Sequence, residues 1–253
     1  MPPVSALLAA LLLVVLQALT GCGAGGGASG GAVVSGSAPA SSGAPSSGPS
    51  GGRPSGRSSS PEPLPTATVD PSATPEVPHT DGRPRRALLS IPRLGMTDLP
   101  VEPYRGWTDD APGTETQDGG VAASPFGPRG GTGPGGIGNY QVTAHRLSST
   151  QAFLELPRLR AGDLVHVDVG SRRLTYEVTR TRITSLREPA SLRAQRAAVP
   201  GRPGVEAIRA MITLSTCRTP EDRAEGNTWS DRFGNPEHRI DKIGVLRSIE
   251  RRP

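Results

Sequence analysis

Residues 163–183 read DLVHVDVGSRRLTYEVTRTRI, and this stretch decides the class of fold. Valine occupies every second position from Val165 to Val169, with polar residues between the valines. A period of two is typical of a strand that buries one of its faces. Gly170 interrupts the pattern before a second run begins. The stretch therefore predicts two successive strands, Asp163–Val169 and Arg172–Ile183.

The rest of residues 85–253 shows similar short apolar runs, each bounded by turn-forming residues. Seven or eight short strands with few helices favour a closed β-barrel or a β-sandwich. The Gly-rich segment 127–138 lacks a phosphate-binding lysine and dinucleotide spacing, so we interpret it as a connector. The remaining expected strands are Ala87–Ile91, Leu99–Tyr104, Asn139–Ala144, Ile208–Thr216 and Ile240–Ile249, with short helices near Gln151–Leu156 and Ala190–Ala197.

The chain of 253 residues contains 33 Gly and 27 Pro, and many of them precede the predicted β domain. Residues 23–84 are rich in Gly, Ala and Ser and then in Pro and Thr, and every aromatic residue follows position 100. Ordering a backbone costs roughly 1–2 kcal/mol per residue, which so little apolar bulk does not offset. We therefore expect a disordered linker at 23–84 with an r.m.s. reach of about 40–45 Å, followed by one folded domain at 85–253.

Residues 1–22 have the character of an export signal or membrane anchor. The run SALLAALLLVVLQAL at 5–19 has the length of a signal-peptide core, and it is shorter than a bilayer-spanning helix. Leu19-Thr20-Gly21-Cys22 follows, and it resembles the lipobox of bacterial lipoproteins, in which the cysteine is acylated. The alternative is a single-span anchor. Both interpretations place the rest of the chain on the extracellular face of the cytoplasmic membrane.

The formal net charge is +5, with arginine supplying nearly all of the positive charge. The basic residues are scattered along the chain, without a basic arm or an interleaved aromatic patch. The charge pattern therefore does not predict a nucleic-acid partner. The spacing of His, Asp and Glu suggests no metal site, and no cofactor is implied.

Cys217 is the most informative residue of the predicted domain. It ends the β-branched run MITLSTC at 211–217, which reads as a buried strand. An exported thiol that stays unpaired at the end of a strand is accessible to a substrate, so Cys217 is the candidate nucleophile. The alternative is a small buried hydrophobic residue.

A nucleophilic thiol needs a proton acceptor, and histidine suits that task near neutral pH. The chain has four histidines. His145 ends the predicted strand 139–144 and is the best candidate. His79 lies in the predicted linker, and His166 is on the outward face of its strand. His238, before the last strand, remains a second choice.

A guanidinium stabilises the oxyanion that forms when a thiolate attacks a carbonyl. Arg218 and Arg146 adjoin Cys217 and His145, and the period of two points their side chains to the opposite face. Arg239 opens the final strand and is the candidate third member of the site, with Arg232 as the fallback.

The order of these residues resembles the sortase family of cysteine transpeptidases, closest to the class E sortases of actinobacteria. The resemblance covers residues 85–250. The motifs that carry it are Ile91-Pro92-Arg93-Leu94-Gly95, Thr143-Ala144-His145-Arg146, the segment LPRLRAGD at 156–163, Leu174-Thr175-Tyr176-Glu177-Val178 and Thr213-Leu214-Ser215-Thr216-Cys217.

The resemblance implies a mostly β fold, an eight-stranded β-barrel with short helices. It assigns Cys217 as nucleophile, His145 as acid and base, Arg239 as the oxyanion or substrate arginine, and Thr216 as a residue of the substrate groove. It also implies cleavage of a sorting signal of the LPXTG or LAXTG type and transfer of the acyl group to an amine of a peptidoglycan precursor or pilin. The partners are then surface proteins that carry such signals.

Three other classes of protein are alternatives to this interpretation. An L,D-transpeptidase shares the order His before Cys, but it carries a histidine two residues before its nucleophile, where this chain has Ser215. Papain-like amidases have the opposite order of Cys and His. A non-catalytic surface lipoprotein with a sortase-like binding domain is the alternative from a different class.

Overall fold

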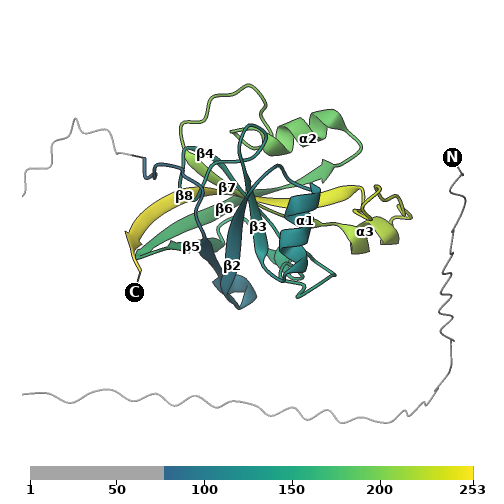
Figure 1. The fold of residues 1–253 in the computed structure, drawn as a ribbon, viewed down its shortest axis with the longest axis horizontal. Helices are drawn as coiled ribbons and strands as arrows, with labels where there is room; N and C mark the ends of the chain where they lie inside the picture. Colours follow the sequence, from purple (N-terminus) through teal and green to yellow (C-terminus); the bar gives the residue numbers. More distant parts are fainter. Residues whose placement is uncertain (1–76, 253) are drawn as a thin grey trace, which may run out of the picture. The chain divides into compact units, whose positions relative to one another are not determined.

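The computed structural model describes residues 77–252, so the predicted anchor, Cys22 and most of the predicted linker lie outside the described residues. In this described part of the chain, eight strands close into a barrel in the order β1-β2-β3-β4-β7-β8-β6-β5 (Figure 1). The predicted β-barrel is confirmed. The strands are β1 Ala87–Ile91, β2 Met96–Arg105, β3 Ala122–Phe126, β4 Gly138–Thr143, β5 Leu164–Val169, β6 Arg172–Ser185, β7 Ala210–Cys217 and β8 His238–Arg251.

Within residues 77–252, three short α-helices lie in the connections between strands (Figure 1). They are α1 Ala111–Asp118, α2 Pro189–Arg196 and α3 Thr219–Ala224. The expected helix near 190–197 is confirmed as α2, within one residue at each end. The helix expected near Gln151–Leu156 is wrong, because that segment forms turns and then a 3-10 turn at Leu156–Arg158. In residues 77–252, no helix has the length and hydrophobicity that crossing a bilayer requires.

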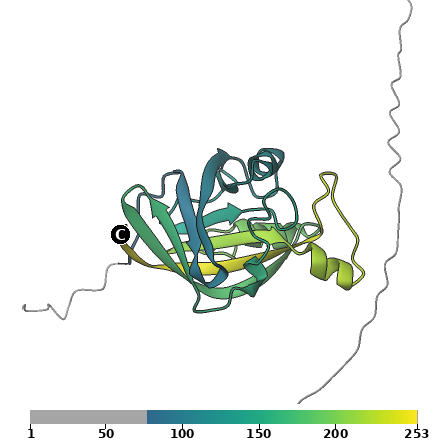
Figure 2. The same cartoon turned by 90° about the horizontal axis from the view of Figure 1, so that it is seen from below.

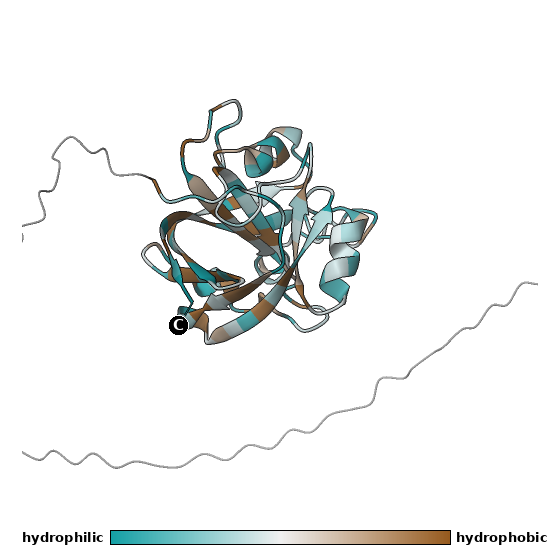
Figure 3. Cartoon of the chain, turned by 60° about the vertical axis from the view of Figure 1, so that its left-hand side comes forward, coloured by the Kyte–Doolittle hydropathy of each residue, from teal (hydrophilic) through white to brown (hydrophobic). Residues whose placement is uncertain are grey.

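The barrel interior follows from the alternation along its strands. Val165 and Val167 of β5 are fully buried, whereas Leu164 is 43% exposed. Tyr140 and Tyr176 are the largest fully buried side chains of the core. Burying a large apolar side chain stabilises a fold by roughly 1.5–3 kcal/mol. Hydrophobic residues accordingly concentrate on the strands, while helices and loops are mostly hydrophilic (Figure 3).

The outer face of β7 and β8 is polar, and helix α2 covers part of it. Ile212 and Leu214 of β7 belong to the apolar core, so the alternating residues Thr213, Ser215 and Cys217 face outward. Ser215 pairs in register with Asp241, which is 1% exposed. This carboxylate accepts hydrogen bonds from Thr184 (2.5 Å), from Ser215 (2.7 Å) and from Gln195 of α2 (3.0 Å). Helix α2 therefore covers a hydrogen-bonded polar surface on β7 and β8, and Cys217 lies at the end of β7 on the same face.

The Gly-rich segment 127–138 is a close-packed connector. Gly133 donates to the Gly82 carbonyl (2.7 Å), and Thr80 donates to the Gly135 carbonyl (2.8 Å). A Cβ on Gly133 would lie 2.0 Å from the carbonyl oxygen of Arg83, so only glycine permits this approach. Thr80 and Gly82, which the sequence assigns to the linker, are thus hydrogen-bonded to this connector.

Lys242 interrupts the apolar pattern of β8 because it satisfies buried carbonyl groups. The residue is 4% exposed, and its ammonium donates to the carbonyls of Pro157 (2.9 Å) and Leu159 (2.6 Å) and to the Thr181 hydroxyl (2.9 Å). All three donors of the ammonium are therefore used, and burial lowers its pKa.

We expect Lys242→Met to lower the free energy of unfolding by roughly 2–4 kcal/mol, because two carbonyl groups lose their donor. Urea denaturation measures the change. The control is Arg247→Met on the same strand, which removes only an exposed ion pair with Glu177. Equal stability of the two variants would contradict the expectation.

Candidate active site

The pairing of β7 with β8 brings Cys217 and Arg239 together. The two residues are direct cross-strand partners. The Arg239 guanidinium donates from Nη1 to the Cys217 sulfur at 3.1 Å, and Cys217 is a free thiol in the described part of the chain. Of the two arginines left open by the sequence, the structure therefore places Arg239 at the thiol. Arg232 is exposed, and its guanidinium stacks on the Phe233 ring at 4.6 Å.

Two opposing effects act on the Cys217 thiol. Burial raises its pKa, and the nearby Arg239 lowers it. Asp109 raises it further, and Arg146 acts in the same direction as Arg239. The thiolate is the nucleophilic form of cysteine. Burial thus favours the neutral thiol, whereas the Arg239 guanidinium favours the nucleophilic thiolate.

His145 follows the end of β4 and lines the same recess as Cys217 and Arg239. Its Nε2 lies 2.8 Å from Oδ1 of Asp118, the last residue of α1, and its side chain is 14% exposed. Thr216 is buried and donates its hydroxyl to the Ala144 carbonyl (2.8 Å). This bond ties β7 to the residue before His145. The recess is lined by Asp109, Thr114, Gln117, Thr143, Ala144, His145, Ser215, Thr216, Cys217, Asn235 and Arg239.

Asp109 completes the charged part of the site, although the sequence did not indicate it. Its Oδ1 accepts from Arg239 Nε at 2.8 Å, while its buried Oδ2 has no partner in the described structure. Asp109 has φ of +67°, in the left-handed region that non-glycine residues rarely adopt. A strained residue with half of its carboxylate unpaired is typical of a functional position.

We expect Asp109→Asn to lower the pKa of Cys217, because it removes the anion that disfavours the thiolate. Alkylation by iodoacetamide at pH 8 should accelerate roughly three- to tenfold, equivalent to about half to one pH unit. Glu115→Gln is the matched control, since it removes one exposed carboxylate from α1 at a position outside the recess. Unchanged or slower alkylation of the Asp109 variant would contradict this assignment.

Arg146 and Arg218, which follow His145 and Cys217 in the sequence, are paired with carboxylates of the β7–β8 connection. This connection projects from the barrel (Figure 2). Arg146 donates to Glu221 (2.8 Å), and it also donates to the Cys217 carbonyl (3.3 Å). Arg218 donates to the buried Asp222 (2.7 Å). Neither guanidinium donates to the thiol, and Arg146 contacts the Cys217 backbone instead.

The other histidines make separate contacts. His238 Nδ1 lies 2.9 Å from Asp222 Oδ1. His166 Nδ1 lies 3.1 Å from the Thr175 hydroxyl, and the exposed His79 contacts the Val77 carbonyl. Among residues 77–252, His145 is therefore the histidine that lines the recess.

The residues that sequence reasoning missed lie on or next to α1. Asp110 caps this helix by accepting from the Gly113 amide (3.0 Å), and Gly119 follows its last residue. An Asp cap, a Pro in the first turn and a terminal glycine are helix signals. These signals predict α1, but the contacts of Asp109 with Arg239 and of Asp118 with His145 depend on tertiary packing.

Comparisons with known proteins agree with this geometry. The sortase-domain family model matches residues 89–233. No curated protein matches the chain in sequence. Several solved structures are similar: SrtA sortase from Actinomyces oris (19% identity, 72% of this chain and 93% of that chain, TM-score 0.52), sortase E1 from Streptomyces coelicolor with a tripeptide in its active site (19%, 69% and 94%, 0.49), and sortase E from Streptomyces avermitilis (26%, 68% and 93%, 0.48).

The family model spans more than half of the chain and includes both His145 and Cys217. The Actinomyces oris enzyme shares the overall fold. A closed eight-stranded barrel that presents a thiol beside an arginine agrees with both findings. The chain therefore belongs to the sortase family, whose members are cysteine transpeptidases.

Proposed function

We propose that this sortase cleaves an LPXTG- or LAXTG-type sorting signal between Thr and Gly, and that it transfers the acyl group to an amine of a peptidoglycan precursor or pilin. The observation that carries the proposal is the 3.1 Å contact between the Cys217 sulfur and Arg239, at a recess that His145 also lines. Because the chain is a cysteine transpeptidase, the L,D-transpeptidase and the non-catalytic lipoprotein are set aside.

In the first half-reaction, the Cys217 thiolate attacks the carbonyl carbon of threonine, and the Arg239 guanidinium stabilises the oxyanion. When the tetrahedral adduct collapses, the carbon–nitrogen bond breaks. Protonated His145 donates its proton to the departing glycine amine. The products are an acyl thioester on Cys217 and the free carboxyl-terminal fragment.

In the second half-reaction, His145 accepts a proton from the incoming amine as that amine attacks the thioester carbonyl. The carbon–sulfur bond then breaks, and Cys217 leaves as a thiolate beside Arg239. One amide is exchanged for another through a thioester, so the reaction needs no external energy source. Thr216 donates to the Ala144 carbonyl and lines the recess. In this proposal it positions His145 and contacts the bound signal.

The full chain, incubated with LPXTG or LAXTG peptides and an amine, tests this function. Mass spectrometry of tryptic fragments should find a peptide adduct on Cys217, and adding the amine should remove it and yield the transpeptidation product. A scrambled peptide is the control. Folded protein that gives neither adduct nor cleavage would overturn the proposal.

We also propose that the amino-terminal segment holds the enzyme at the extracellular face of the cytoplasmic membrane, with Cys22 as the lipidated residue. The support is the sequence LTGC at 19–22, preceded by an apolar run. Cys22→Ser should then abolish incorporation of labelled palmitate and leave an unprocessed precursor. A membrane-held product of unchanged mass would instead favour a single-span anchor.

A further inference from the structure

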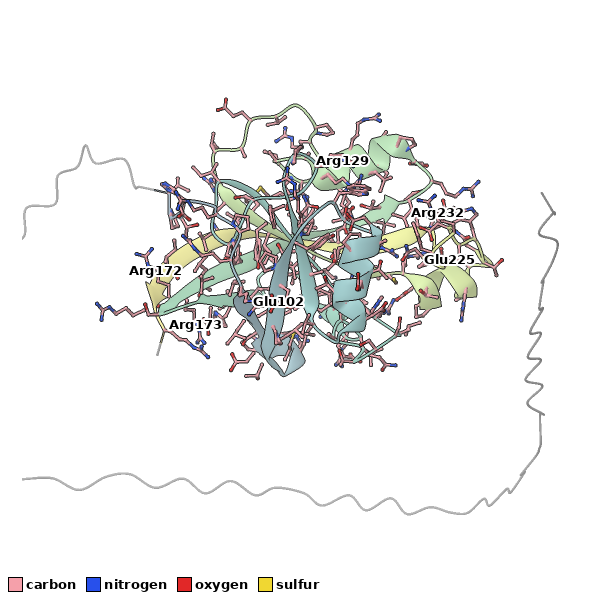
Figure 4. All side chains as sticks on the ribbon, in the orientation of Figure 1. Glu102, Arg129, Arg172, Arg173, Glu225 and Arg232 are labelled. Carbon is pink, nitrogen blue, oxygen red and sulfur yellow. The ribbon has the colours of Figure 1, made fainter. Side chains whose placement is uncertain are left out.

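A second pocket lies between the connector that follows β3 and helix α2. Its volume is about 540 Å³, which falls within the range of ligand-binding pockets. Three of its lining residues are Arg129, Arg193 and Arg196, and none is acidic. Figure 4 shows Arg129 beside α2. The apolar part of the wall includes Pro128, Leu192 and Pro203.

The three guanidinium groups lack carboxylate partners within the described part of the chain. Most arginines around the catalytic recess are paired, as Arg239 is with Asp109. By contrast, Arg129, Arg193 and Arg196 form no salt bridge with any residue of 77–252. Burial lowers the pKa of Arg196, and Arg129 lowers it further, while Asp109 and Asp110 oppose this effect. An anion in the pocket would relieve the repulsion between these guanidinium groups.

The pocket is joined to the catalytic centre by three consecutive residues, each of which contacts a different arginine. The Arg129 guanidinium stacks on the Trp107 ring, 3.5 Å from its centroid. Arg196 donates to the hydroxyl (3.0 Å) and the carbonyl (2.9 Å) of Thr108. Asp109 then pairs with Arg239, which donates to Cys217.

The Cα atoms of Trp107 and Asp109 are two residues apart, at most about 7 Å of extended chain. Residues 107–109 thus connect the arginines of the pocket to the arginine at Cys217, and an extended substrate bound at Cys217 would follow this segment toward the pocket. The stacking of Arg129 on Trp107 and the hydrogen bonds of Arg196 to Thr108 restrain these two guanidinium groups, which lowers the entropic cost of binding.

We propose that this pocket binds a carboxylate carried by a substrate of the enzyme. The carboxylate belongs either to an acidic residue of the donor peptide or to the acceptor, next to its reacting amine. Guanidinium groups bind carboxylates through paired, charge-assisted hydrogen bonds, and the apolar wall accommodates the methylene groups of the stem. The inference rests on the proposed transpeptidation for the identity of the ligands.

Two matched sets of substrates separate the two sources. For the donor, ELAQTG is compared with QLAQTG and LAETG with LAQTG. For the acceptor, lysine is compared with cadaverine, which lacks the α-carboxylate. We expect kcat/KM to be at least fivefold higher for the carboxylate-bearing member of one set, and we expect the preference to weaken with added salt.

The variant Arg129→Gln/Arg193→Gln should reduce this preference to below twofold while cleavage of the neutral substrate persists. Arg196 stays intact because it also holds Thr108. Arg160→Gln is the control, since Arg160 is exposed and lies outside the pocket. Equal rates within every set, or a preference that survives the double variant, would overturn the proposal.

A binding measurement keeps this test separate from that of the proposed function. The chain has two tryptophans, so Trp229→Phe leaves Trp107 as the fluorescent reporter of the pocket. Titration with ELAQTG, LAETG or lysine should change Trp107 fluorescence at concentrations at least fivefold lower than the matched neutral compound. If no peptide is cleaved, the proposed reaction fails; if, in addition, no compound discriminates in this titration, the pocket proposal fails as well.

Discussion

Replacement of His145 by glutamine is expected to lower kcat/KM for acyl transfer by about 10²–10⁴-fold, because the departing amine loses its proton donor. Glutamine keeps a hydrogen-bond donor near the position of Nε2, which contacts Asp118. The loss should therefore appear in kcat, with KM changed less than threefold. Stopped assays with a fluorogenic sorting-signal peptide measure both constants.

His238→Asn is the matched control for this change. Asparagine keeps a donor near the position of Nδ1, which contacts Asp222, and its activity should stay within threefold of the wild type. A larger loss for His238→Asn than for His145→Gln would move the acid and base role to His238. That outcome would contradict the recess as the site of proton transfer.

Replacement of Arg239 by glutamine is expected to lower kcat by roughly 10²–10³-fold, because the oxyanion loses its charged donor. The same change should slow alkylation of Cys217, since Arg239 lowers the pKa of this thiol. Arg239→Lys should recover part of the rate, because a point charge replaces the planar guanidinium fork. Arg232→Gln should remain within twofold of the wild type.

Loss of Arg239 also leaves the carboxylate of Asp109 buried without its partner, and breaking a buried pair destabilises a protein by about 3–5 kcal/mol. The double variant Asp109→Asn/Arg239→Gln removes both charges. It should recover stability in thermal unfolding while remaining inactive. An active double variant would show that Arg239 acts only by neutralising Asp109.

The outcome for the strands shows how far local pattern predicts this fold. The range of β1 matches its prediction residue for residue, and β5 differs by one residue at its start. Strand β3 was missed because its sequence AASPF contains no alternation of apolar and polar residues. It becomes a strand because its backbone pairs in parallel with β2 and Ala123 pairs with Thr143 of β4. These partners come from other parts of the chain, so a local window contains no signal for them.

The sequence by itself determined three features: the barrel strands whose apolar and polar residues alternate, the thiol at the end of β7 and the histidine after β4. Each of these features depends on a few neighbouring residues. Only the tertiary structure decided which charged groups surround the thiol. Arg239 is 22 residues from Cys217, and Asp109 is 130 residues from Arg239. Their contacts arise from the register of β7 against β8 and from the packing of residues 107–109 over that edge. Register depends on the pairing of whole strands, so the choice between Arg239 and Arg232 stayed open until that pairing was known.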